Sequence, residues 1–205
     1  YLDTVKQLFY TNAFLIFSNG EQARIGTIGS KWEFFHEWKR LQEEEDGSLE
    51  IETMLRGVCD KKNLLDLLEN FIFFDHSDGK IAKIMAKNHQ YLGVNRAVEK
   101  YRQSKEEKKL FNTAIKDVEC QEEDDSRKLG VFWHTQGSGK SYSMAFFAQK
   151  IRRKFVGSPT IVVLTDREEL NKQISGIFEN CGLLGPVKAK KFIAQSGDDL
   201  NNKLQ

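Results

Sequence analysis

The first thirty residues show the alternation of apolar and polar side chains that is typical of a β-hairpin. An apolar run at residues 14–17 leads into a Ser-Asn-Gly turn at residues 18–20, and residues 23–28 then place Arg and Thr between apolar neighbours. Asn-Gly between two apolar runs is a strong hairpin signal, because both residues tolerate the positive φ of a tight turn. Residues 31–41 predict a short amphipathic segment, and residues 43–47 predict a solvated acidic loop.

Two further stretches repeat apolar side chains at helical spacing. The first covers residues 50–74, and the second covers residues 80–103 after a break at Asp78-Gly79. Side chains three or four positions apart lie on the same face of a helix. The expected apolar faces consist of Leu64, Leu65, Leu68, Phe71 and Ile72 in the first stretch and of Tyr91, Val94, Val98 and Tyr101 in the second.

The pattern changes after a very polar tract at residues 104–128, which is the expected domain junction. Residues 129–133 and 160–165 predict two strands, and helices are expected from Lys140 and over residues 167–178. Strands and helices that alternate with short connections predict parallel strands joined by right-handed crossovers. The residues expected to be buried are Met144, Phe147, Ala148, Ile151 and Phe155 in the first helix and Leu170, Ile174, Ile177 and Phe178 in the second.

Composition and charge narrow the classes of function. The chain has 205 residues, of which 40% are hydrophobic, and its 31 basic and 30 acidic side chains give a net charge of +1. This balance excludes a polybasic binder, so any contact with nucleic acid must come from a local patch. No apolar run approaches the ~20 residues of a membrane helix. The three cysteines and four histidines are scattered and form no disulfide or metal pattern, which favours a reduced, cytoplasmic protein.

The most informative residues are 134–141, which read His-Thr-Gln-Gly-Ser-Gly-Lys-Ser. Gly137 and Gly139 let backbone N–H groups converge on phosphates, and the N-terminus of the following helix adds its positive dipole. Lys140 supplies a charge for the β- and γ-phosphates, and the Ser141 hydroxyl can bind Mg²⁺. This is the phosphate-binding pattern G-x-x-x-x-G-K-[ST], except that His134 stands where the general pattern has Gly. A Gly-rich turn with no ligand is the alternative.

Residues 165–167, Thr-Asp-Arg, follow the second predicted strand and have three interpretations. Asp166 could hold Mg²⁺ as a Walker B acid, although Thr165 separates it from the apolar run. We favour a loop at the carboxyl end of the strand, where ligands bind in open α/β sheets, with Thr165 and Arg167 suited to a phosphodiester backbone. Asp166 with Glu169 also matches a helix capping box.

These motifs together resemble a known family. Residues 132–141 and 162–167, with Leu170 and Gln173 after them, are similar to motifs I and Ia of the R (HsdR) subunit of type I restriction enzymes, a motor of helicase superfamily 2. Helicase versions of the loop keep G-x-G-K-[ST] and relax the position that His134 occupies here. His89-Gln90-Tyr91 resembles the adenine-reading Q motif of this family, although Gln90 could also be an ordinary polar residue beside the buried face of a helix.

The resemblance extends upstream and implies a domain organisation. Residues 14–20 and 32–38 resemble the back of the family's nuclease domain, and residues 64–74 resemble the stretch that joins it to the motor. The implied fold class is α/β, with the end of a PD-(D/E)xK-type nuclease domain joined by helices to the start of a RecA-like P-loop parallel sheet. The implied parts are the C-terminal part of the nuclease domain at 1–48, a helical linker with the Q-like segment at 49–128, and the N-terminal part of the first RecA-like domain at 129–205.

The resemblance also implies a function and its residues. The parent enzyme would use ATP and Mg²⁺ to translocate double-stranded DNA, would cut it as a type I site-specific deoxyribonuclease, and would act with modification (M) and specificity (S) subunits. Gln90 would read adenine, and Thr165 and Arg167 would lie near the DNA. The loop residues that would hold the phosphates, with Ser141 on Mg²⁺ and Lys140 and Ser141 in the catalytic roles, are Thr135, Gln136, Gly137, Ser138, Gly139, Lys140 and Ser141.

Three alternatives stay open at this point. A superfamily 2 helicase or repair translocase without a nuclease would share residues 129–180. A P-loop kinase would use Asp166 as a metal ligand, and a non-catalytic nucleotide-gated module would dock a partner through the acidic tract at 119–125. The chain begins without Met and ends inside a predicted helix, so we expect an internal piece of a longer polypeptide. Without a second acidic motif, such a piece is expected to be inactive.

Overall fold

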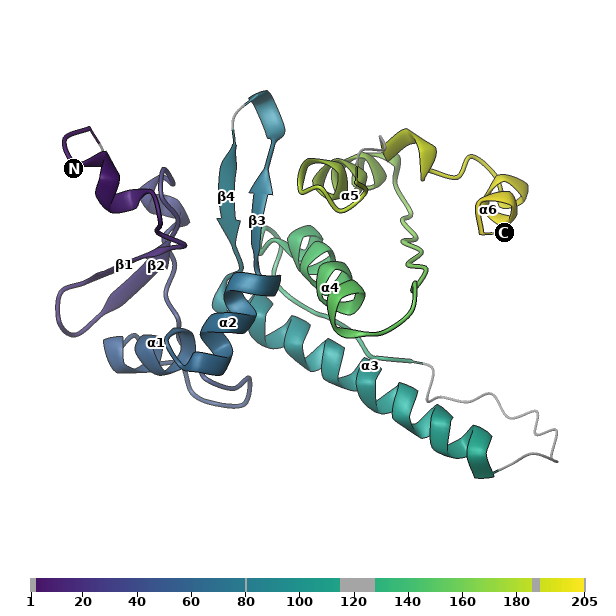
Figure 1. Cartoon of the computed structure of the whole chain (residues 1–205), viewed down its shortest axis with the longest axis horizontal. Coiled ribbons are helices and arrows are strands. Elements are labelled where there is room, and N and C mark those ends of the chain that lie inside the picture. Colours follow the sequence, from purple (N-terminus) through teal and green to yellow (C-terminus); the bar gives the residue numbers. More distant parts are fainter. Residues whose placement is uncertain (1–2, 80, 115–127, 186–188, 205) are drawn as a thin grey trace.

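The fold was analysed in a computed structural model, which describes residues 3–79, 81–114, 128–185 and 189–204. The chain is mixed α/β, as expected, with helices packed around two small antiparallel sheets (Figure 1). The strands are β1 (Leu15–Ser18), β2 (Ala23–Gly26), β3 (Ile72–Asp75) and β4 (Ala82–Met85). The α-helices are α1 (Ile51–Val58), α2 (Lys61–Asn70), α3 (Asn88–Ala114), α4 (Lys140–Lys154), α5 (Glu168–Asn180) and α6 (Gly197–Leu204). None of these helices has both the length and the apolar character needed to cross a membrane.

The predicted hairpin is confirmed. β1 pairs with β2 in antiparallel register, with Ile16 opposite Ile25. The Asn19 side chain closes the turn, because its Oδ1 accepts the backbone N–H groups of Glu21 and Gln22 at 3.0 and 2.8 Å. The aromatic segment that follows returns to the hairpin through a backbone bridge between Ile25 and His36.

Residues 50–74 differ from the single helical stretch that the spacing predicts. α1 ends at Val58, and Asp60 begins α2, since its carboxylate accepts the N–H groups of Lys62 and Asn63 in the first turn of α2. This break changes the helical phase, so Leu67 is fully buried while Leu65 is 67% exposed. Phe71 and Ile72 lie beyond the helix, and the chain continues as β3.

The helix predicted from residue 80 begins only at Asn88, because residues 82–85 form β4. β3 and β4 are two short apolar runs around the Asp78-Gly79 turn, and they pair in antiparallel register with Phe73 opposite Ile84. The Asn88 side chain holds the start of α3, with its Oδ1 accepting the N–H groups of Lys39 and Arg40. α3 extends to residue 114, well into the polar tract.

Helix α4 carries the centre of the core. Phe146 is fully buried and stacks on Phe73 of β3 with ring centroids 4.7 Å apart. Of the predicted buried face, Ala148 and Ile151 are confirmed, while Met144 is 45% exposed and was wrongly placed inside. α5 packs on α4, and of its predicted inward side chains Ile174 is buried while Ile177 and Phe178 pack against the core.

The two strands predicted at residues 129–133 and 160–165 are not formed. Both segments are extended coil, and Val131 and Leu164 are 92% and 86% exposed. A strand needs a neighbouring strand to satisfy its backbone N–H and C=O groups. Within the described part of the chain neither segment has such a neighbour, so the parallel sheet that the alternation predicts is absent from these residues.

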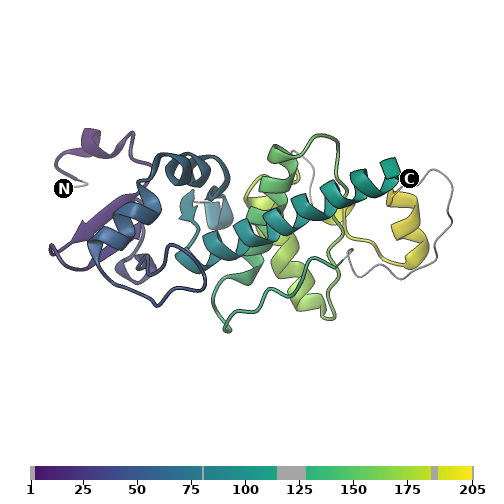
Figure 2. The same cartoon turned by 90° about the horizontal axis from the view of Figure 1, so that it is seen from below.

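A buried ion pair joins the three helices that surround the core. The Lys150 ammonium of α4 donates to both carboxylate oxygens of Asp66 on α2 at 2.6 Å, and it also donates to Asn95 on α3. Figure 2 shows the long helix α3 crossing α4, and the two helices are in contact. Burial lowers the pKa of Lys150, and the Asp66 carboxylate opposes that effect. The charge therefore stays inside the protein only because its partners surround it.

We expect Lys150→Met to destabilise the fold by about 3 kcal/mol, because it leaves the Asp66 carboxylate buried without its cation. Urea unfolding measures this loss. The matched control is Arg102→Met, which breaks an exposed ion pair with Glu99 on α3 and should change stability little. The double variant Lys150→Met/Asp66→Leu should recover most of the loss. Equal effects of the buried and the exposed substitutions would contradict this account.

Candidate nucleotide-binding site

The glycine-rich segment forms a tight loop immediately before α4. Gly137 and Gly139 have φ values of 77° and 86°, in the left-handed region that favours glycine. Gly139 is also the residue that precedes the first turn of α4. The left-handed backbone of Gly139 favours glycine there, and a Cβ would in addition lie 2.8 Å from Nε2 of Gln90 and displace that amide.

The Lys140 side chain folds back over this loop. Its ammonium group donates to the carbonyl oxygens of His134 and Thr135 at 2.6 and 2.8 Å. Lys140 is exposed and stands at the N-terminus of α4, where the first N–H groups of the helix have no helical partner. The loop therefore presents an ammonium charge and the positive end of a helix dipole at one place.

Two hydroxyl groups of the loop lie in different surroundings. Ser141 is buried, and its Oγ accepts a hydrogen bond from Nε2 of Gln173 on α5 at 3.3 Å. The Ser138 hydroxyl is buried without a hydrogen-bond partner among the described residues, and so is Nδ1 of His134. Unsatisfied buried polar atoms are rare in proteins, and they are compatible with a ligand at this loop.

The start of α3 reaches the loop through two side chains. Gln90 is buried, donates from Nε2 to the Gly139 carbonyl at 2.9 Å, and accepts the Lys87 N–H on Oε1 at 2.8 Å. The His89 Nε2 lies 3.0 Å from the Ser138 carbonyl oxygen. Residues some fifty positions apart in sequence thus meet at the loop, and α3 fixes its backbone.

A hollow of about 470 Å³ opens beside the loop. Its lining includes His89 and Leu92 from α3, His134 from the loop, and Arg40 and Glu43 from the segment that precedes α1. Burial lowers the pKa of His89, and the nearby His134 and Lys87 lower it further. Burial and Lys140 likewise lower the pKa of His134, while Glu43 raises it. Both imidazoles are therefore neutral at pH 7, where they can donate and accept one hydrogen bond each.

Comparison with known proteins identifies the family. A model of the SWI2/SNF2 ATPase family matches residues 89–205, which is more than half of the chain. The chain belongs to the SWI2/SNF2 ATPase family. The matched region begins at His89, so it includes the whole loop, α4, α5 and all of α3 except its first residue.

Curated relatives agree with the resemblance seen in the sequence. The HindI type I restriction enzyme endonuclease subunit of Haemophilus influenzae is 36% identical over 187 residues, which cover 88% of this chain and 16% of that protein. A putative type I restriction enzyme endonuclease subunit of Methanocaldococcus jannaschii, MjaIXP, is 28% identical over 196 residues, which cover 86% and 17%. The likeness to R (HsdR) subunits is thereby confirmed. The chain spans about a sixth of the length of these relatives.

The predicted DNA-contacting residues of this SWI2/SNF2 ATPase chain lie at the start of α5. Arg167 is exposed, precedes the first turn of α5, and places Nε 3.6 Å from Oδ2 of Asp166. The capping box predicted from Asp166 and Glu169 is wrong, because no side chain caps this helix. No hydrogen bond or ion pair among the described residues joins Thr165 or Arg167 to the loop.

Two of the three basic residues at 152–154, which end α4, act within the fold, because Arg152 donates to the Leu183 carbonyl and Lys154 pairs with Glu69. The acidic tract at 119–125, which the sequence offers as a docking segment, lies outside the described residues. Among the residues that are described, no group of His, Cys, Asp or Glu is arranged to hold a metal ion.

Sequence reasoning missed Gly93, which lets the coil segment at residues 129–133 approach α3 closely. A Cβ on Gly93 would lie 2.3 Å from Cε2 of Phe132. The Phe132 ring in turn packs on the His134 ring, with ring centroids 4.4 Å apart. A glycine inside a helical pattern was the available signal, since it weakens the helix unless something packs closely there.

We expect Gly93→Ala to weaken nucleotide binding by the full-length protein about tenfold, because the added methyl group must displace Phe132 and with it the loop. Isothermal titration with ATP measures the affinity. Gly176→Ala is the matched control, since a Cβ there, also in a helix, meets nothing within 4 Å. Unchanged affinity in Gly93→Ala would mean that Phe132 does not position the loop.

Proposed function

We propose that this chain is part of the ATP-dependent DNA-translocating and DNA-cleaving subunit of a type I restriction-modification system, and that it binds ATP with Mg²⁺ through residues 135–141. The observation that carries the proposal is the loop itself. Two left-handed glycines, a lysine and a helix N-terminus converge there, within a chain related to type I endonuclease subunits.

Each loop residue has a role in this proposal. The N–H groups from Gly137 to Ser141 surround the phosphates, and Lys140 exchanges its two carbonyl partners for the β- and γ-phosphates. Ser141 would hold Mg²⁺ once Gln173 releases its hydroxyl, and a bound Mg²⁺ would supply charge neutralisation for phosphoryl transfer. Thr135, Gln136 and Ser138 shape the turn around them.

Recognition of the base is assigned to the start of α3. The hollow of about 470 Å³ that is lined by Arg40, Glu43 and His89 adjoins the loop and has room for a purine. Gln90 would read adenine with the same amide that now binds the Gly139 carbonyl, so reading the base would also change the hydrogen bonds of the loop. The neutral His89 and His134 rings are suitable neighbours for a flat base.

The proposed domain organisation follows the same relatives. Residues 1–48 would belong to a PD-(D/E)xK-type nuclease domain, 49–128 to the linker, and 129–205 to the first RecA-like domain. The exposed apolar segments at 129–133 and 160–165 would be strands of its P-loop sheet, completed by strands elsewhere in a longer polypeptide. Thr165 and Arg167 would then stand at the carboxyl edge of that sheet and contact the DNA backbone.

The proposed partners are double-stranded DNA and the M and S subunits, in the cytoplasm. The second candidate is a superfamily 2 translocase that has no nuclease, which the SWI2/SNF2 match at residues 89–205 favours. The relatives favour the restriction enzyme, because their names include an endonuclease and their matches cover 88% and 86% of the chain and so extend beyond residues 89–205. Plasmid cleavage by the full-length protein with M and S subunits separates the two.

We expect Lys140→Ala to lower DNA-stimulated ATP turnover of the full-length protein about a hundredfold, because the charge that stabilises the phosphates is lost. A coupled phosphate-release assay with and without duplex DNA measures the turnover. Lys154→Ala, at the other end of the same helix, is the control and should retain turnover. Hydrolysis indifferent to duplex DNA would exclude both motor functions, and full turnover in Lys140→Ala would exclude the loop as the ATP site.

A further inference from the structure

Strand β3 has one edge that no other strand covers in the part of the chain that the structure describes. Its partner β4 lies on the other side, with Ile72 opposite Met85, and the Ala86 N–H donates to the Phe71 carbonyl at 3.0 Å. In an antiparallel pair the bonded and unbonded positions alternate. Phe71, Phe73 and Asp75 therefore direct their backbone groups toward β4, while the N–H and C=O groups of Ile72 and Phe74 point away from it.

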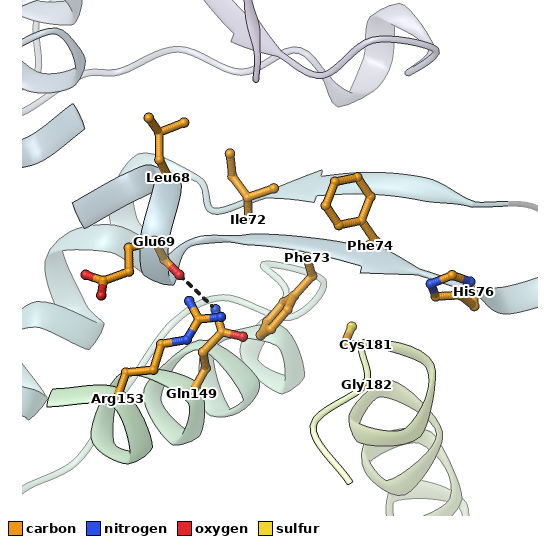
Figure 3. Close-up of a pocket in the computed structure, with 10 residues that line it drawn as sticks. All are labelled: Leu68, Glu69, Ile72, Phe73, Phe74, His76, Gln149, Arg153, Cys181 and Gly182. Carbon is orange, nitrogen blue, oxygen red and sulfur yellow. Dashed lines mark hydrogen bonds between the residues drawn. The ribbon is translucent and has the colours of Figure 1, made fainter. Parts of the chain in front are cut away.

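A hollow of about 720 Å³ runs beside this open edge. Side chains from both faces of β3 line it, Ile72 and Phe74 on one face and Phe73 on the other (Figure 3). Successive side chains of a strand point to opposite faces, so only a hollow at the strand edge can touch both sets. The hollow therefore exposes the backbone of β3 as well as its side chains.

Both ends of the open edge are closed by the protein itself. The His76 N–H donates to the Asn180 carbonyl at the end of α5 at 3.2 Å. At the other end the Gln149 side chain donates to the Asn70 carbonyl at 3.3 Å. Four backbone groups, those of Ile72 and Phe74, remain between these closures, and no hydrogen bond within the described residues satisfies them.

This edge also lacks the usual protection against pairing. Open edges in native proteins are commonly blocked by proline, by an inward-pointing charge or by a bulge. β3 reads Ile-Phe-Phe-Asp and pairs with β4 without a bulge, and its one charged residue, Asp75, lies at the end of the strand with its buried carboxylate occupied by hydrogen bonds from Tyr142 and Ser77. An unprotected apolar edge inside a hollow is the arrangement that strand-addition sites use to bind extended peptides.

We propose that the β3 edge binds an extended segment of a partner protein, which adds as a strand of about four residues. The two faces of the hollow define its side chains. Leu68 and Phe74, 41% and 52% exposed, present an apolar surface on one face. On the other face lie the exposed Arg153 and Glu69 (Figure 3), and the Glu69 carboxylate has its ion pair with Lys154, whereas Arg153 makes no hydrogen bond or ion pair within the described residues. The segment therefore alternates apolar and acidic side chains. This inference does not depend on the ATP site.

The test is a displayed library of random ten-residue peptides, selected on the full-length protein. Enriched peptides are expected to alternate apolar and acidic residues. Their affinity, measured by fluorescence anisotropy, should fall about tenfold or more in Arg153→Glu and in Phe74→Pro. Proline at 74 removes the outward N–H but no bond to β4, because a strand tolerates proline where its N–H faces away from the sheet.

Two matched variants separate the edge from general effects. Lys172→Glu makes the same charge change on exposed α5 outside the hollow, and Phe74→Val keeps both an apolar side chain and the N–H. Lys172→Glu should bind the selected peptides as the unaltered protein does, and Phe74→Val should bind them more tightly than Phe74→Pro, because it loses part of the apolar surface but keeps the N–H. No enrichment, or enriched peptides that bind all four variants equally, would overturn the proposal. So would protection of Ile72 and Phe74 from hydrogen exchange in the protein alone, because the edge would then already be paired within the chain or with a second copy.

Discussion

The ammonium group of Lys150 carries a charge into the interior, and the arrangement of the other helices depends on how that charge is satisfied. Desolvation of a cation is costly unless partners surround it, and Asp66 and Asn95 supply those partners from two different helices. The Phe71 ring, whose centroid is 5.0 Å from the ammonium, closes a further side. α2, α3 and α4 are therefore held in one relative position rather than merely packed by apolar contact.

This position decides where the candidate nucleotide site lies. α4 carries the loop at its N-terminus and Lys150 three turns later, while α3 carries Gln90 one turn and a half before Asn95. Fixing the two helices at Lys150 and Asn95 brings Gln90 within 2.9 Å of the Gly139 carbonyl. The side chains of Gln90, Lys140 and Ser141 are already paired within the protein, so a nucleotide would have to exchange their hydrogen bonds rather than add to them. Each such exchange contributes only about 1 kcal/mol, so the charge of Lys140 and the helix dipole must supply most of the attraction.

The sequence predicted what local signals determine. Turn chemistry and periodicity predicted the Ser-Asn-Gly hairpin, the loop at 134–139, the helix that begins at Lys140 and the helix over residues 167–178. All of these elements are present. The β3–β4 hairpin was mistaken for helix, since short apolar runs fit either periodicity until a partner strand decides between them. The Lys150–Asp66 pair could not be predicted, because its members are 84 residues apart and each alone reads as a surface charge.

One physical rule explains why similar apolar runs have different fates in this chain. Residues 72–75 and 160–165 are both rich in β-branched or aromatic side chains, yet only the first is a strand. β3 has β4 beside it and Phe73 stacked on Phe146, so pairing and burial reinforce each other. The run at 160–165 has neither, and its apolar side chains stay exposed although the sequence favours a strand. Strand formation is thus a property of the pair and not of the segment. The same rule applies to the open edge of β3, where the backbone is already extended, so a partner segment needs to order only itself.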